Sequence, residues 1–127
     1  MNKNALADTK REVVCHQDDL QPGQMLEYTF GRHPVVVCRA EDGRFFAFLN
    51  RCIHQGAPLS KGKLCGATAP TSNIGEYRFE KEGDILRCPW HGREFDIKNS
   101  GCMLAQPKYK LKSFKVTVED EHVVIYR

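Results

Sequence analysis

Two short segments each place a cysteine near a histidine, and these four residues have the types and spacing of metal ligands. The first segment holds Cys52 and His54, and the second holds Cys88 and His91. Thiolate and neutral imidazole are the side chains that bind transition metals such as zinc and iron. Each segment supplies one of each, so the two segments together would provide two sulfur and two nitrogen ligands.

The order of the ligands distinguishes between two kinds of metal site. Tetrahedral zinc sites also use two cysteines and two histidines, but they usually pair Cys with Cys and then His with His. The Cys-x-His and Cys-x-x-His spacings instead suit a 2Fe-2S cluster with two cysteines on one iron and two histidines on the other. Gly56 and Gly92 follow the histidines closely. We expect them to let backbone N–H groups approach the cluster sulfurs.

The six cysteines of the chain could alternatively form a disulfide framework. Disulfides require an oxidising compartment, and the polar stretch from Met1 to Arg11 lacks the apolar segment of a secretory signal. We therefore expect a cytoplasmic protein with reduced thiols. Cys15 and Cys38 lie in apolar runs, where a free thiol usually serves as a small core residue.

Size and composition indicate one folded domain. The chain has 127 residues, of which 41% are hydrophobic. Its net charge of +3 is too small to indicate a nucleic-acid partner. No run of residues approaches the roughly 18 apolar positions that a membrane-spanning helix needs, so no membrane span is expected.

The hydrophobic pattern predicts a nearly all-β protein. Apolar residues alternate with polar ones, as at Leu26, Tyr28 and Phe30, and Asp42-Gly43 is typical of a hairpin turn. The predicted strands are Glu12–His16, Met25–Phe30, Pro34–Arg39, Arg44–Leu49, Ile85–Arg87, Glu94–Asp96, Phe114–Glu119 and His122–Tyr126. This pattern favours a small antiparallel β sandwich or a partly closed barrel.

Both ends of the chain have strong strand signals, and the middle does not. Glycine, proline and polar residues accumulate between the two ends, and residues 61–75 look the loosest. We therefore expect residues 1–127 to form a single domain. Its scaffold would be made from about 11–50 and 107–127, with a loop-rich segment of about 51–106 inserted to carry the metal site.

The two segments resemble the ligand loops of a known family. Cys-x-His-Gln-Gly-Ala-Pro-Leu and Cys-Pro-Trp-His-Gly-x-Glu-Phe-Asp look like those of Rieske 2Fe-2S proteins, most closely the ferredoxin and oxygenase-type Rieske domains. The resemblance implies a Rieske-like antiparallel β sandwich with an inserted loop-rich cluster-binding subdomain. It also implies one cluster, with Cys52 and Cys88 on the inner iron and His54 and His91 on the outer iron.

Two differences from the respiratory Rieske proteins indicate which subclass of the family this chain resembles. Respiratory Rieske proteins carry an additional disulfide between the two loops, and the matching positions here are Ala57 and Trp90. The same proteins place serine and tyrosine hydroxyls near the cluster, where this chain has Arg93 and Phe95. With fewer donors to the sulfurs, we expect a reduction potential at the lower end of the roughly −150 to +300 mV range of Rieske centres.

The distance between the two loops is also unusual. His54 and Cys88 are separated by 33 residues, about twice the gap expected for the family, and the surplus falls at about 61–80. One interpretation is a tolerated surface excursion, because lengthening a loop costs little closure entropy. The other is a lip beside the cluster that contacts a partner.

The resemblance implies a ferredoxin-like electron carrier rather than an enzyme. Such a protein would pass single electrons from a flavoprotein reductase to an oxygenase or a similar acceptor. Catalysis would need a further site in which two histidines and a carboxylate bind one iron. His122 is the only histidine after Asp96, so no such site is expected in this sequence. The alternatives are a small Rieske subunit of a larger oxidoreductase and a redox or iron sensor.

Overall fold

The computed structural model describes residues 11–53, 56, 58–70, 77–89 and 92–127. In these ranges the chain forms ten strands and two short 3-10 helices. The strands are β1 (Arg11–His16), β2 (Met25–Phe30), β3 (His33–Arg39), β4 (Phe45–Leu49), β5 (Lys63–Pro70), β6 (Tyr77–Arg87), β7 (Glu94–Asp96), β8 (Cys102–Met103), β9 (Ser113–Glu119) and β10 (His122–Tyr126), and the helices are η1 (Gln17–Asp19) and η2 (Leu59–Lys61).

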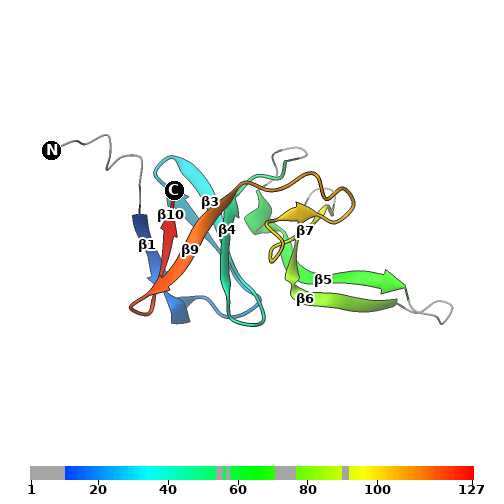
Figure 1. Cartoon of the computed structure of the whole chain (residues 1–127), viewed down its shortest axis with the longest axis horizontal. Helices are drawn as coiled ribbons and strands as arrows, with labels where there is room; N and C mark the ends of the chain where they lie inside the picture. The colour runs from blue at the N-terminus through cyan, green and yellow to red at the C-terminus, as the bar shows by residue number, and fades with distance from the viewer. Residues whose placement is uncertain (1–10, 54–55, 57, 71–76, 90–91) are drawn as a thin grey trace.

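The strands form two antiparallel sheets that lie side by side (Figure 1). The larger sheet has the order β1-β10-β9-β4-β3-β2, and the smaller has the order β5-β6-β7-β8. The β5–β6 hairpin belongs to the smaller sheet and projects away from the larger one (Figure 1). The predicted all-β antiparallel architecture is therefore confirmed.

The larger sheet curls until its two edge strands meet. β1 and β2 stand at opposite ends of the strand order, yet Tyr28 Oη on β2 donates a hydrogen bond to Glu12 Oε1 on β1 at 2.6 Å. A side-chain bond of that length requires the edges to face each other across a narrow gap. The scaffold is thus a partly closed barrel.

β3 separates two hydrophobic cores because its side chains alternate between its two faces. Val35 and Val37 belong to the barrel core, and Val36 and Cys38 belong to a second core between the sheets. The barrel core comprises Leu20, Phe30, Val35, Val37, Ala47, Phe114, Val123 and Ile125. The inter-sheet core comprises Val36, Cys38, Ala40, Phe48, Cys52, Leu59, Leu86, Cys88, Phe95, Ile97, Met103 and Leu111.

Because it is covered on both faces, β3 is buried from Val35 to Cys38, which explains its continuous apolar run. Burial raises the pKa of the Cys38 thiol, because the charged thiolate is poorly solvated there. This confirms the expectation that Cys38 is a core residue. The burial of β3 on both faces also shows that the smaller sheet packs on the wall of the barrel.

The strand predictions agree with the structure over most of the chain, and the main error lies at residues 61–75. Met25–Phe30, Glu94–Asp96 and His122–Tyr126 agree at both boundaries. Residues 61–75 were expected to be the loosest part, but Lys63–Pro70 is strand β5, paired with β6 through a register that shifts between Cys65 and Ala67. The strand signal is weak there because only Lys63–Cys65 belongs to the wider part of the sheet, where the same residues of β6 also pair with β7. The rest of β5 pairs with the other end of β6 alone.

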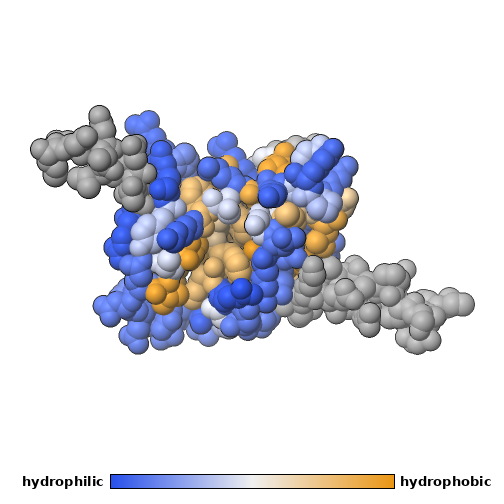
Figure 2. All heavy atoms as spheres, viewed as in Figure 1, coloured by the Kyte–Doolittle hydropathy of each residue, from blue (hydrophilic) through white to orange (hydrophobic). Residues whose placement is uncertain are grey.

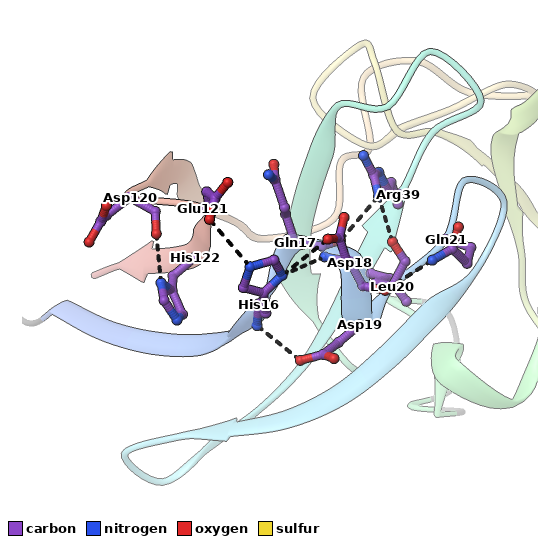
Figure 3. A network of polar contacts seen from close by, with 10 residues as sticks. All are labelled: His16, Gln17, Asp18, Asp19, Leu20, Gln21, Arg39, Asp120, Glu121 and His122. Carbon is purple, nitrogen blue, oxygen red and sulfur yellow. Dashed lines mark hydrogen bonds and ion pairs between the residues drawn. The ribbon is translucent and has the colours of Figure 1, made fainter.

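A polar network fixes the end of the barrel where β1 meets the β9–β10 turn (Figure 3). The His16 Nδ1 atom accepts a hydrogen bond from the Asp18 N–H, and Asp19 accepts one from the His16 N–H. These two bonds form a capping box in which His16 caps the N-terminal end of η1. Arg39 on β3 donates to the carbonyl oxygens of Gln17 and Leu20, and so ties η1 to the barrel wall.

Apolar residues gather in the middle of one face, over β4 and β9, within a hydrophilic surround (Figure 2). A hollow of about 290 Å³ lies there, with Phe45, Phe46 and Val116 in its lining. The strands β4 and β9 pair only at Ala47 and Phe48, which leaves the rest of the two strands apart. Among the described residues, no helix is long and apolar enough to cross a membrane.

Candidate metal centre

The first ligand loop leaves the barrel at the end of β4. Asn50 is buried, and its Nδ2 donates to Ser60 Oγ at 2.9 Å while its Oδ1 accepts from the Ser60 N–H at 2.8 Å. The Asn50 N–H donates to the carbonyl oxygen of Pro34 on the barrel. These bonds close the base of the loop that contains Cys52 and fasten it to the scaffold.

The second ligand loop connects β6 to β7. Arg87 and Glu94 face each other across the strand pair, and Arg87 Nη2 donates to Glu94 Oε2 at 2.6 Å. This hydrogen bond raises the pKa of the Arg87 guanidinium above its ordinary value. The Cys88 N–H donates to the Arg93 carbonyl oxygen at 2.9 Å, which joins the two ends of the loop between β6 and β7.

The backbone turns of the two loops have the same form. The Cys52 carbonyl oxygen accepts from the Gly56 N–H at 2.8 Å, and the Cys88 carbonyl oxygen accepts from the Gly92 N–H at 3.1 Å. Both glycines have positive φ, 76° and 67°, a conformation that favours glycine. The expectation that these glycines let backbone N–H groups approach the cluster sulfurs stays a prediction.

Two thiols, one from each loop, enter the same core. Cys52 and Cys88 are each 3% exposed and belong to the inter-sheet core together with Leu59 and Phe95. Cysteine from two separate loops in one apolar core can bury one side of a metal group and exclude water from it. The arrangement thus brings together the two predicted sulfur ligands.

The two predicted imidazole ligands, His54 and His91, lie outside the described residues, as do Ala57 and Trp90. The described part of the chain alone contains no group of three or more metal-binding side chains. What it does contain fits the sulfur half of the proposed donor set. At Gly56 and Gly92, a Cβ atom would find no described atom within 4 Å, so there is room beside both turns.

Sequence reasoning missed the residues that hold the loops in place. Asn50 and Ser60 bracket the first loop, and Arg87 and Glu94 bracket the second. Gly62 was missed as well. It lies against the backbone of Arg87, the residue before Cys88. The oppositely charged pair on either side of the Cys88 loop was the one available signal, since cross-strand partners of a hairpin often carry opposite charges.

Comparison with known proteins identifies the family. Residues 10–115 match the family model described as "Rieske [2Fe-2S] domain". The chain belongs to this family. A Rieske domain binds one 2Fe-2S cluster, so the expected cofactor is confirmed, and two buried thiols on paired loops agree with it.

Relatives of this Rieske domain differ in length. It is 28% identical over 112 residues to the ferredoxin component of biphenyl 2,3-dioxygenase from Rhodococcus jostii, covering 88% of each chain. It is 33% identical over 118 residues to Apoptosis-inducing factor 3 from Mus musculus, covering 93% of this chain but only 16% of the mouse protein.

A solved structure shows the same fold. The complex of reduced oxygenase and oxidized ferredoxin in carbazole 1,9a-dioxygenase contains a chain that superposes with a TM-score of 0.68 at 28% identity. The match covers 90% of this chain and 99% of that one. The whole-chain match confirms the Rieske-type arrangement of the two sheets.

Proposed function

We propose that this Rieske domain is a ferredoxin-like electron carrier whose 2Fe-2S cluster is held by Cys52, His54, Cys88 and His91. It would take single electrons from a flavoprotein reductase and pass them to an oxygenase or a similar acceptor, in the cytoplasm. The observation that carries the proposal is the burial of Cys52 and Cys88 in one core at matched turns. The match to a dioxygenase ferredoxin component over 88% of its length supports the carrier role.

The chain's own residues would set the environment of the cluster. The cluster, when bound, supplies a centre that gains and loses one electron. Leu59 and Phe95, both fully buried, close the core around the two cysteines and keep water from that side. Phe95 has no hydroxyl to donate, which supports a potential in the lower part of the Rieske range.

We also propose that the chain is a single domain with a scaffold of about 11–50 and 107–127 and a cluster-binding segment of about 51–106. The sheet boundaries support this division: β1–β4, β9 and β10 make the larger sheet, and β5–β8 make the smaller one. The shared inter-sheet core favours one folding unit over two.

The ligand assignment is tested by substituting single cysteines. Cys52→Ala and Cys88→Ala should lose the visible absorption, the bound iron and the electron paramagnetic resonance signal of a reduced Rieske cluster. Cys102→Ala is the matched control, because Cys102 is also a buried cysteine but is not among the proposed ligands. Two irons per chain are expected in the wild-type protein. A colourless wild-type protein that holds only zinc would refute the proposal.

A further inference from the structure

Charge is distributed unequally between the two parts of the chain. Among the described residues of 51–65 and 84–112, nine are Arg or Lys and three are Asp or Glu, whereas the described residues of 11–50 and 113–127 include six basic and nine acidic ones. The three acids of the first group are Asp84, Glu94 and Asp96. Asp84 and Glu94 form ion pairs with Lys98 and Arg87, and Asp96 is buried. The excess positive charge of this part is therefore left at its surface.

Part of this positive charge lies beside the second ligand loop. The lining of a hollow of about 290 Å³ includes Lys61, Lys63 and Arg87 together with the loop residues Cys88, Pro89 and Gly92. Lys61 and Lys63 are exposed. Lys61 Nζ lies 3.4 Å from Glu27 Oε1 and Arg87 is paired with Glu94, so among the described residues Lys63 supplies the positive charge that is not balanced here. Because charges near a redox centre act on whatever approaches it, Lys63 bears directly on the choice of partner.

An apolar hollow lies beside the first ligand loop. Its volume is about 260 Å³, and its lining includes Ile53, Met103 and Tyr109 together with Arg93. Ile53 and Tyr109 are 44% and 45% exposed, which is unusual for side chains of this size. Lys108 lies 5.2 Å from the centre of the Tyr109 ring, so positive charge borders this hollow too.

We propose that the two hollows, with the described residues of the ligand loops that line them, form one docking face, which binds a redox-partner protein through an acidic surface on that partner. This inference rests on the electron-carrier function proposed above. Lys63 and Lys108 would attract the acidic surface at long range, and Ile53 and Tyr109 would supply the apolar contact at its centre. The scaffold, with its excess of acidic residues, would turn away from the same partner and so orient the encounter.

The test uses one acceptor protein in two charge states. Cytochrome c is basic, and succinylation converts its lysines to carboxylates while keeping the same haem. In each reaction one electron leaves the reduced cluster and reduces the haem iron from ferric to ferrous. We expect salt to slow reduction of the succinylated form and to speed reduction of the native form, each roughly tenfold between low and high ionic strength.

Two pairs of charge reversals locate the effect. Lys63→Glu with Lys108→Glu should reduce or reverse both salt dependences. Lys115→Glu with Arg127→Glu is the matched control: both residues are exposed, both belong to the scaffold, and the net charge changes by the same amount. If the control pair alters the rates as much as the first pair, overall charge rather than this face governs the encounter, and the proposal is wrong.

The apolar contact is tested separately. Tyr109→Ser should slow reduction of succinylated cytochrome c several-fold, while Val118→Ser, at an exposed scaffold residue, should leave it unchanged. Equal salt dependence for the two forms of cytochrome c would overturn the docking face but leave the electron carrier intact. A protein that reduces neither form, even with its cluster bound, would overturn the carrier function as well.

Discussion

Gly62 lies directly against the backbone of Arg87. A Cβ atom at position 62 would stand 1.8 Å from the Arg87 carbonyl oxygen, far inside contact distance. Gly62 ends the turn of η2 after the first ligand loop, and Arg87 precedes Cys88 in the second. The close approach of these two residues therefore sets the distance between the two ligand loops.

Gly62→Ala is expected to destabilise the protein by about 3 kcal/mol or more, because the added methyl group must push one loop away from the other. The cluster should be lost in the same variant, since the two cysteines would separate. Urea unfolding and iron content per chain measure the two effects. Gly43→Ala provides the control: it strains a turn with φ of 93° on the scaffold, so it should cost stability while iron content stays normal.

His91→Cys is expected to lower the reduction potential. A thiolate adds a negative charge that a neutral imidazole lacks, which moves the centre toward the roughly −400 mV of clusters with four cysteines. Protein-film voltammetry or a redox titration gives the value. His122→Cys, on the scaffold, should leave the potential unchanged. A low potential is predicted because Arg93 and Phe95 supply no hydroxyl donors to the cluster. A wild-type potential well above about +100 mV, within the known Rieske range, would contradict that prediction.

The hydrogen bond between Tyr28 and Glu12 is expected to make the stability of the barrel fall at high pH. The hydrogen bond to Glu12 raises the pKa of Tyr28 to about 12, from an ordinary value of 10.0. Because the folded state favours the protonated phenol, the stabilisation is complete below pH 10 and is lost as pH rises through 12. Tyr28→Phe should lose about 1 kcal/mol at neutral pH. The difference in urea midpoint between wild type and Tyr28→Phe should shrink at high pH.

Lys98 connects the two parts of the chain. Its Nζ lies 3.0 Å from Asp42 Oδ2 in the β3–β4 turn and 3.2 Å from Asp84 Oδ2 on β6. The Arg44 N–H, together with Lys98 and the Arg44 side chain, holds the pKa of Asp42 well below its ordinary value. The carboxylate therefore stabilises the fold above pH 3.8, and this contribution is lost as pH falls below that value.

Lys98→Met should therefore lower the urea midpoint at pH 7, and its deficit relative to wild type should narrow toward pH 3. Asp84 is the reason for a measurable loss of stability, because its Oδ1 atom is buried and has no hydrogen-bond partner among the described residues. Lys98→Met combined with Asp84→Asn should recover part of the midpoint. No recovery would show that Lys98 acts through packing of its aliphatic chain rather than through its charge.

The scaffold was predictable because each strand carries its own local signal. Leu26, Tyr28 and Phe30 alternate with polar residues, and Asp120-Glu121 adopts the positive φ values of a tight hairpin turn. The strand β5 was not predictable in the same way. It is the edge strand of the smaller sheet and pairs with β6 alone, so it lies outside the wider strand pairing that gives the other strands a regular pattern.

The sequence by itself determined the chemistry, because the spacing of Cys52, His54, Cys88 and His91 and the residues around them are local properties that survive without any fold. Only the tertiary structure decided how the two loops are held at a fixed separation. That depends on contacts between residues distant in the chain: Asn50 with Pro34, Gly62 with Arg87, and Lys98 with Asp42. Local pattern does not encode such contacts, since each arises only when separate strands have packed around a common core.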